Sequence, residues 1–203
     1  MFQDLALSGY GQSPSVVALE DVQAGGAVGV PDQEPCQGVD KFQENNKRER
    51  YLSDDEIARM IEALRTEPNR VAADTLTFLM LTGLRRNEGL QARWEHVDLE
   101  RERLFLPNTK SGKSRHVVLN AEAMDLLKRQ PRVEGNPYIF PGRIAGKPLN
   151  NPDKALKRVK AAAVVDNLRL HDLRHTFASV AVDEGWQIYD VKNLLGHASP
   201  NTT

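Results

Sequence analysis

The sequence predicts a mainly helical α+β domain that carries one small, three-stranded antiparallel sheet. Helical patterns, in which apolar residues recur every three or four positions, dominate the chain on both sides of a central segment. Within that segment, β-rich runs occupy 94–99, 104–106 and 115–119, and a polar turn with glycine at 108–113 joins the last two. Strands gathered in one stretch of a helical chain are typical of the α+β class.

The first predicted helix begins at a capping box. Ser53 and Glu56 stand three residues apart ahead of an apolar pattern, which is the signature of a helix N-terminus. Ile57, Ile61 and Leu64 recur on one face of this helix, and we expect that face to pack on the core.

The second predicted helix spans 70–82 and should be the buried helix of the core. Its centre, residues 76–81, is apolar on nearly every side. Gly83 ends this helix, and a short helix over 86–92 follows. Trp186, much later in the chain, is expected to be a packing residue. Further helices are expected at about 121–129, 152–164, 172–184 and 187–195.

Residues 1–40 are predicted to be a separate, irregular and acidic leader. They are rich in Gly, Pro, Gln and Ser, and they contain six acidic residues and no Lys or Arg. The other 22 of the 28 acidic residues and all 27 basic residues follow, so residues 41–203 carry a net charge of +5. A mildly basic domain fits a nucleic-acid partner, and ordinary surface charge explains the same number equally well.

The composition excludes several classes of protein. No apolar run approaches the roughly 18 residues of a membrane span, and residues 1–10 lack the pattern of a signal peptide. Cys36 is the only cysteine, which leaves no disulfide framework and no cysteine-based zinc site. We therefore expect a cytoplasmic protein.

Residues 171–175, His-Asp-Leu-Arg-His, predict a phosphate-handling surface on the helix over 172–184. His171, Arg174 and His175 share one stripe, because positions three and four apart share a helix face, and a second, apolar stripe packs. An arginine donates two parallel hydrogen bonds to phosphate oxygens and keeps its charge, and a histidine exchanges a proton near neutral pH. A solvated, purely structural face is the alternative.

A second cationic element follows the buried helix. Arg85 leaves the core just after Gly83, where it can reach a bound anion, and Glu88, three residues on, can orient or partly neutralise it. A helix cap with a surface ion pair is the alternative. Lys110 and Lys113 lie in the predicted hairpin tip, from which a lysine can protonate a leaving oxygen in a groove, unless it serves only solubility.

No metal site is expected at the histidines. His171 and His175 have the i, i+4 spacing of zinc ligands, but Asp172 stands where the metalloprotease pattern requires glutamate. Arg174 between them would repel a dication. His197, which follows Leu-Leu-Gly after a predicted helix, is a weak signal by itself.

Four motifs, taken in order, resemble those of the tyrosine recombinases, also called phage-type integrases. They are Thr-Gly-Leu-Arg-x-x-Glu (82–88), Thr-Lys-Ser-Gly-Lys-x-Arg (109–115), His-x-x-Arg-His (171–175) and Leu-Leu-Gly-His (194–197). The resemblance covers roughly residues 41–203 and implies the fold of the catalytic domain of this family.

The resemblance also implies an enzyme that cuts and rejoins double-stranded DNA with neither metal, ATP nor another cofactor. In this family a tyrosine attacks the scissile phosphate, forms a 3′-phosphotyrosyl link and releases a 5′-hydroxyl, and the reverse attack reseals the strand. Family members act as tetramers on paired sites. Double-stranded DNA and further copies of the chain are therefore the expected partners.

By position, the resemblance assigns catalytic roles to five residues. Arg85 and Arg174 would clamp the non-bridging oxygens and stabilise the charge of the transition state. Lys110 would be the general acid for the leaving 5′-oxygen. His171 would assist proton transfer, and His197 would hydrogen-bond the phosphate.

Five more residues have supporting roles in this interpretation. Glu88 would support the Arg85 region, and His175 would be a second supporting residue of the site. Contacts to DNA are expected from Arg86, Lys113 and Arg115.

Two departures from the family pattern leave alternatives open. The nucleophilic tyrosine would stand near position 206, so the catalytic domain is expected to be incomplete at its C-terminus. The tyrosines of this chain occupy other positions: 10, 51, 138 and 189. Residues 1–40 do not match the family's N-terminal DNA-clamping domain. A catalytically dead DNA-binding relic, or a subunit that accepts a neighbour's tyrosine, are the alternatives.

Overall fold

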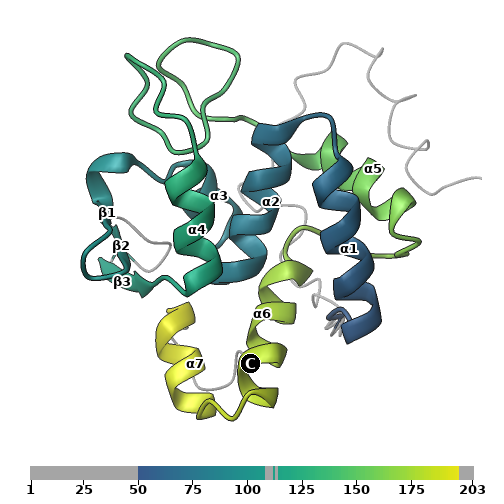
Figure 1. Cartoon of the computed structure of the whole chain (residues 1–203). Helices are drawn as coiled ribbons and strands as arrows, with labels where there is room; N and C mark the ends of the chain where they lie inside the picture. Colours follow the sequence, from purple (N-terminus) through teal and green to yellow (C-terminus); the bar gives the residue numbers. More distant parts are fainter. Residues whose placement is uncertain (1–49, 108–111, 113, 197–203) are drawn as a thin grey trace, which may run out of the picture. The chain divides into compact units, whose positions relative to one another are not determined.

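The computed structural model describes residues 50–107, 112 and 114–196 (Figure 1). The predicted leader, the hairpin-tip residues Lys110 and Lys113, and His197 lie outside the described residues. The predicted fold class is confirmed, because helices dominate and the strands form one small sheet. The elements are α1 Asp54–Thr66, α2 Arg70–Thr82, α3 Arg86–Leu90, a 3₁₀ turn Trp94–His96, β1 Val97–Asp98, β2 Arg103–Leu106, β3 Arg115–Val118, α4 Ala121–Arg129, α5 Asp153–Ala162, α6 Asp172–Asp183 and α7 Ile188–Leu195.

Helix α1 starts at the predicted capping box. The Ser53 hydroxyl accepts from the Glu56 N–H at 3.3 Å, and the Glu56 carboxylate accepts from the Ser53 N–H at 3.0 Å. Met60 and Leu64 are buried on its inner face. The expectation that Ile61 packs there is wrong: it is 39% exposed, since one residue after Met60 the helix has turned about 100° away from the core.

Helix α2 is the buried centre of the fold, as its all-round apolar sequence predicts. Leu76 and Met80 pack with α1, α5 and the start of α6 in one core cluster. Phe78 and Leu79 face a second cluster with the sheet, α4 and Phe140. Both hydrophobic clusters therefore depend on this one helix, which fixes the position of whatever follows its C-terminus.

The three strands form an antiparallel sheet in the order β1-β2-β3. Leu104 pairs with Val97 on one side and with Val117 on the other, and Leu104 and Val117 are fully buried. The first strand is shorter than predicted, because residues 94–96 form a 3₁₀ turn and the Trp94 N–H donates to the Pro137 carbonyl at 3.0 Å.

Helices α6 and α7 form a pair below the sheet and α2 (Figure 1). Ala181 of α6 packs with Val191 and Leu195 of α7, and Phe177 is partly buried against them. The expectation that Trp186 packs is wrong: it is 49% exposed, because it lies in the turn between the two helices and not on a packed face. No helix in the described part of the chain is long and apolar enough to cross a membrane.

Candidate active site

The turn after α2 places the first arginine. Gly83 ends the helix with φ of 62°, and its N–H donates to the Leu79 carbonyl at 3.0 Å. A Cβ at Gly83 would lie 2.5 Å from a ring carbon of Phe177 and 2.7 Å from a methyl of Leu195. Only glycine therefore lets α2, α6 and α7 approach so closely, and Arg85 follows two residues later at the start of α3.

The Glu88 carboxylate is the centre of the arginine cluster. It accepts hydrogen bonds from the Arg85 N–H at 3.0 Å, from Arg85 Nη1 at 3.0 Å and from Arg115 Nη2 at 2.9 Å. The Glu88 side chain is only 7% exposed, whereas that of Arg85 is 24% exposed. The predicted pairing of Arg85 with Glu88 is thus observed, and Glu88 leaves Arg85 room to face solvent.

Arg174 lies beneath this cluster and not on the surface. It donates to the Gly83 carbonyl at 2.7 Å and to the Leu195 carbonyl at 2.6 Å, and it is 3% exposed. The expectation that its helix stripe presents a cation to solvent is therefore wrong for Arg174. The physical reason is that the backbone turns after α2 and at the end of α7 offer carbonyl partners for the guanidinium.

The C-terminal end of α7 brings three guanidinium groups together. Arg85 Nη2 donates to the Gly196 carbonyl at 3.2 Å, Arg115 Nη1 donates to the Leu194 carbonyl, and Arg174 holds the carbonyl between them. Carbonyls at a helix C-terminus have no partners within the helix and carry partial negative charge. They and Glu88 offset the repulsion between the arginines.

The environment lowers the pKa of the buried arginines. Burial, the largest cause, and the nearby Arg85 together lower the pKa of Arg174 to about 10, and Glu88 opposes the change. Burial also lowers the pKa of Arg115, against the effect of Glu88. Arg174 is still protonated at neutral pH, so the cluster presents positive charge to an anion.

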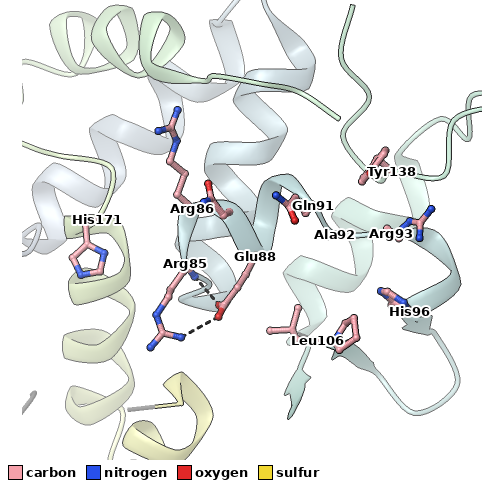
Figure 2. A pocket seen from close by; sticks show the side chains of 12 residues that line it. Arg85, Arg86, Glu88, Gln91, Ala92, Arg93, His96, Leu106, Tyr138 and His171 are labelled. Carbon is pink, nitrogen blue, oxygen red and sulfur yellow. Dashed lines mark hydrogen bonds and ion pairs between the residues drawn. The ribbon is translucent and has the colours of Figure 1, made fainter. Parts of the chain in front are cut away.

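His171 lies across from Arg85 in the same cleft (Figure 2). The cleft has a volume of about 750 Å³. The His171 ring meets that of His175 edge to face, with centroids 5.0 Å apart. Partial burial lowers the pKa of His171, and His175 and Arg174 lower it further. A neutral imidazole beside a cationic group can accept a proton at neutral pH.

The structure brings most of the predicted site residues together. Arg85, Glu88 and Arg115 form one hydrogen-bonded cluster, and Arg174 is bonded to backbone carbonyls beneath it. Arg86 and His171 line the cleft beside the cluster. The Arg115 side chain is 14% exposed and pairs with Glu88, so Arg115 stabilises the cluster from its buried side.

Several other residues that line the cleft were not predicted from the sequence. Gln91, Arg93, His96 and Tyr138 line its far end (Figure 2). Helical spacing gives no signal for Arg93, because helix α3 ends at Leu90 and Arg93 is extended. Tyr138 offered none, since the loop that carries it is placed by tertiary contacts. No group of three or more potential metal ligands occurs among the residues that the structure describes.

Comparisons with known proteins agree with this geometry. The model of the phage integrase family matches residues 50–203. The shufflon-specific DNA recombinase of Escherichia coli is 30% identical over 169 residues, which cover 82% of this chain and 42% of that protein. Tyrosine recombinase XerA of Pyrococcus furiosus is 29% identical over 159 residues, with coverage of 75% and 54%. The chain thus spans about half the length of the curated relatives it matches.

Solved structures show the same fold. XerH recombinase, in a post-cleavage complex with a palindromic difH substrate, superposes with a TM-score of 0.65 at 26% identity, over 80% of this chain and 50% of that one. The catalytic domain of bacteriophage HP1 integrase gives a TM-score of 0.59 at 24% identity, over 75% and 83%. With the family match over three quarters of its length, this chain belongs to the phage integrase family, the tyrosine recombinases.

Proposed function

We propose that this chain is the catalytic domain of a site-specific recombinase, covering residues 41–203, that cleaves and rejoins double-stranded DNA. The main support for the proposal is the cleft in which Arg85 and His171 face each other. The buried Arg115 and Arg174 lie beneath it. A permanently charged guanidinium beside a neutral imidazole suits a phosphodiester, which needs both charge stabilisation and proton transfer. The relatives named above are recombinases and integrases, which supports recombination over a binding-only relic.

In the proposed reaction a tyrosine oxygen, expected near position 206, attacks the scissile phosphorus. The bond from phosphorus to the 5′-oxygen breaks, a 3′-phosphotyrosyl link forms, and the leaving oxygen takes a proton from Lys110. Arg85 stabilises the extra negative charge on the non-bridging oxygens. His171 assists the proton transfers, and His197 hydrogen-bonds the phosphate. The 5′-hydroxyl of the partner strand then attacks the phosphotyrosyl link and restores the phosphodiester.

Arg174 takes part in this proposal from a buried position. Its two observed bonds use two of the five N–H groups of a guanidinium, and the others can serve phosphate oxygens. Because Arg174 is 3% exposed, direct contact requires the turn at Leu194–Gly196 to shift when DNA binds. Glu88 and Arg115 hold Arg85 in place, and His175 supports His171. Arg86 and Lys113 contact the DNA backbone. Arg115 also contacts it once the turn at Leu194–Gly196 has shifted.

Strand cleavage tests the proposal most sharply. The protein, extended to include the tyrosine near position 206, is incubated with a library of random duplexes and then denatured. We expect protein-linked DNA strands that share a sequence, and none from the Arg85→Gln variant. Arg65→Gln removes an exposed charge on α1 and should change nothing. If the extended protein without any substitution binds DNA but yields no linked strands, the binding-only relic would be favoured.

A further inference from the structure

The cleft does not end at the catalytic arginine. It continues along α3 from Arg85 and His171 to a second cationic end, where Arg93 lies beside Tyr138 and His96 (Figure 2). None of these three far-end residues has a role in the proposed reaction. Their presence in the same cleft raises the question of what part of the substrate they meet.

The backbone holds Arg93 rigidly. The residue before it accepts a hydrogen bond from the Ile139 N–H at 3.0 Å, and the residue after it donates to the Pro137 carbonyl at 3.0 Å. The Arg93 guanidinium lies 5.4 Å from the centroid of the Tyr138 ring. A guanidinium stacked on an aromatic ring loses little rotamer freedom when it binds a ligand.

The charges along the cleft remain positive after pairing. Arg85, Arg86 and Arg93 line it, and Glu88, the one carboxylate among the lining residues that the structure describes, is engaged by Arg85 and Arg115. Arg86 Nη2 lies 3.7 Å from a carboxylate oxygen of Asp153, whose side chain is 54% exposed, so this pair is weak and screened. Arg93 Nη1 pairs with Glu95 at 2.7 Å, but the Glu95 side chain is 58% exposed and therefore a weak, screened partner. The Nε atoms of Arg86 and Arg93 are buried and have no hydrogen-bond partner among the described residues.

The spacing matches a duplex backbone. Arg86 and Arg93 are separated by one short helix and the turn that follows it, a path of at most roughly 15 Å. A DNA strand carries one phosphate per roughly 3.4 Å of helix axis, so that span covers a few nucleotides. We propose that Arg93, supported by Tyr138, binds a second backbone phosphate of double-stranded DNA and positions the duplex relative to the scissile phosphate.

This inference rests on the proposed function, and the salt dependence of DNA binding tests it. The dissociation constant of the 203-residue chain for a fluorescent random duplex is measured by anisotropy between about 50 and 200 mM KCl. Losing one phosphate contact lowers the logarithmic salt slope by about 0.9. Over that fourfold rise in salt, the unmodified chain should lose roughly threefold more affinity than Arg93→Gln does.

Two further variants keep the test decisive. Arg65→Gln removes the same charge outside the cleft and should leave the slope unchanged. Glu95→Gln frees Arg93 from its carboxylate and should tighten binding at low salt, a gain that misfolding cannot produce. An unchanged slope in Arg93→Gln, an equal loss in Arg65→Gln, or no gain in Glu95→Gln would overturn the inference. No DNA binding by the unmodified chain would instead overturn the proposed function.

Discussion

Replacing Glu88 with glutamine should destabilise the protein, because this carboxylate is the shared counter-charge of the arginine cluster. It accepts three hydrogen bonds, two from Arg85 and one from Arg115, and it is 7% exposed. Glutamine has nearly the same size, so packing is retained and only charge and acceptor capacity are lost. The substitution therefore isolates the electrostatic contribution of one residue.

The magnitude follows from the contacts. Glu88 Oε2 accepts from the Arg85 N–H and from Arg115 Nη2, and Oε1 accepts from Arg85 Nη1. A glutamine oxygen in the Oε2 position keeps two of these bonds in uncharged form, while the NH₂ group faces the Arg85 Nη1 donor. One charge-assisted hydrogen bond, which contributes about 1.5–3 kcal/mol, is then lost, and the other two weaken to the roughly 0.5–1.5 kcal/mol of bonds to a neutral acceptor. Arg85 is partly exposed and regains water, so we expect a loss of about 3 kcal/mol in the free energy of unfolding. For a domain of this size that lowers the Tm by about 6–12 °C.

Urea unfolding followed by circular dichroism measures this loss. The midpoint should fall at an unchanged slope, since the surface exposed on unfolding is the same. Glu62→Gln is the matched control: its carboxylate pairs with Arg65 on the surface, 68% exposed, and its loss should cost less than about 0.5 kcal/mol. A Glu88→Gln protein within 0.5 kcal/mol of the unmodified chain would refute the view that Glu88 holds the cluster together.

Three other predictions concern single positions. Gly83→Ala should lower the free energy of unfolding in urea by about 2–4 kcal/mol, because the left-handed φ is strained and the added Cβ makes two close contacts. Gly135→Ala, with a similar φ in open space, should cost about 1–2 kcal/mol. Equal losses would contradict the packing argument. The hydrogen bond from Arg50 is the main cause that lowers the pKa of Glu56 to about 2. The ionised carboxylate therefore contributes its full stabilisation above the ordinary pKa near 4.5, and this contribution is lost as the pH falls toward 2. Glu56→Gln keeps the capping box and should destabilise by about 1 kcal/mol at pH 7, and a deficit that persists at pH 2 would argue against the ion pair. His175→Gln removes the ring that helps to lower the pKa of His171 and should raise that pKa in an NMR titration. An unchanged value would show that the two rings do not interact electrostatically.

Local patterns predicted much of the fold. The bounds of α2 and α4 match the sequence interpretation, because an apolar core helix ended by Gly83 and an asparagine-capped amphipathic helix are decided within a few residues. The capping box at Ser53 and the ion pair of Arg85 with Glu88 are likewise contacts over three residues. Such features need no knowledge of the distant chain.

Long-range packing decided what the sequence could not show. The position of Arg174 among helical neighbours predicted a surface stripe, but its carbonyl partners belong to Gly83 and Leu195, which are distant in sequence. The far end of the cleft has the same origin, because Arg93 meets Tyr138 only through pairing of two loops. Helical periodicity identifies which residues share a face, but it does not identify what covers that face.

In the proposed function, the Arg85 side of the cleft binds a DNA backbone phosphate. An NMR titration of the chain with duplex DNA, following the arginine Nε–H and histidine ring signals, tests it most directly. The signals of Arg85 and His171 should shift together with one Kd, while that of the exposed Arg65 on α1 is unaffected. Saturation with DNA that leaves Arg85 and His171 unchanged would contradict the claim and place the DNA on another surface.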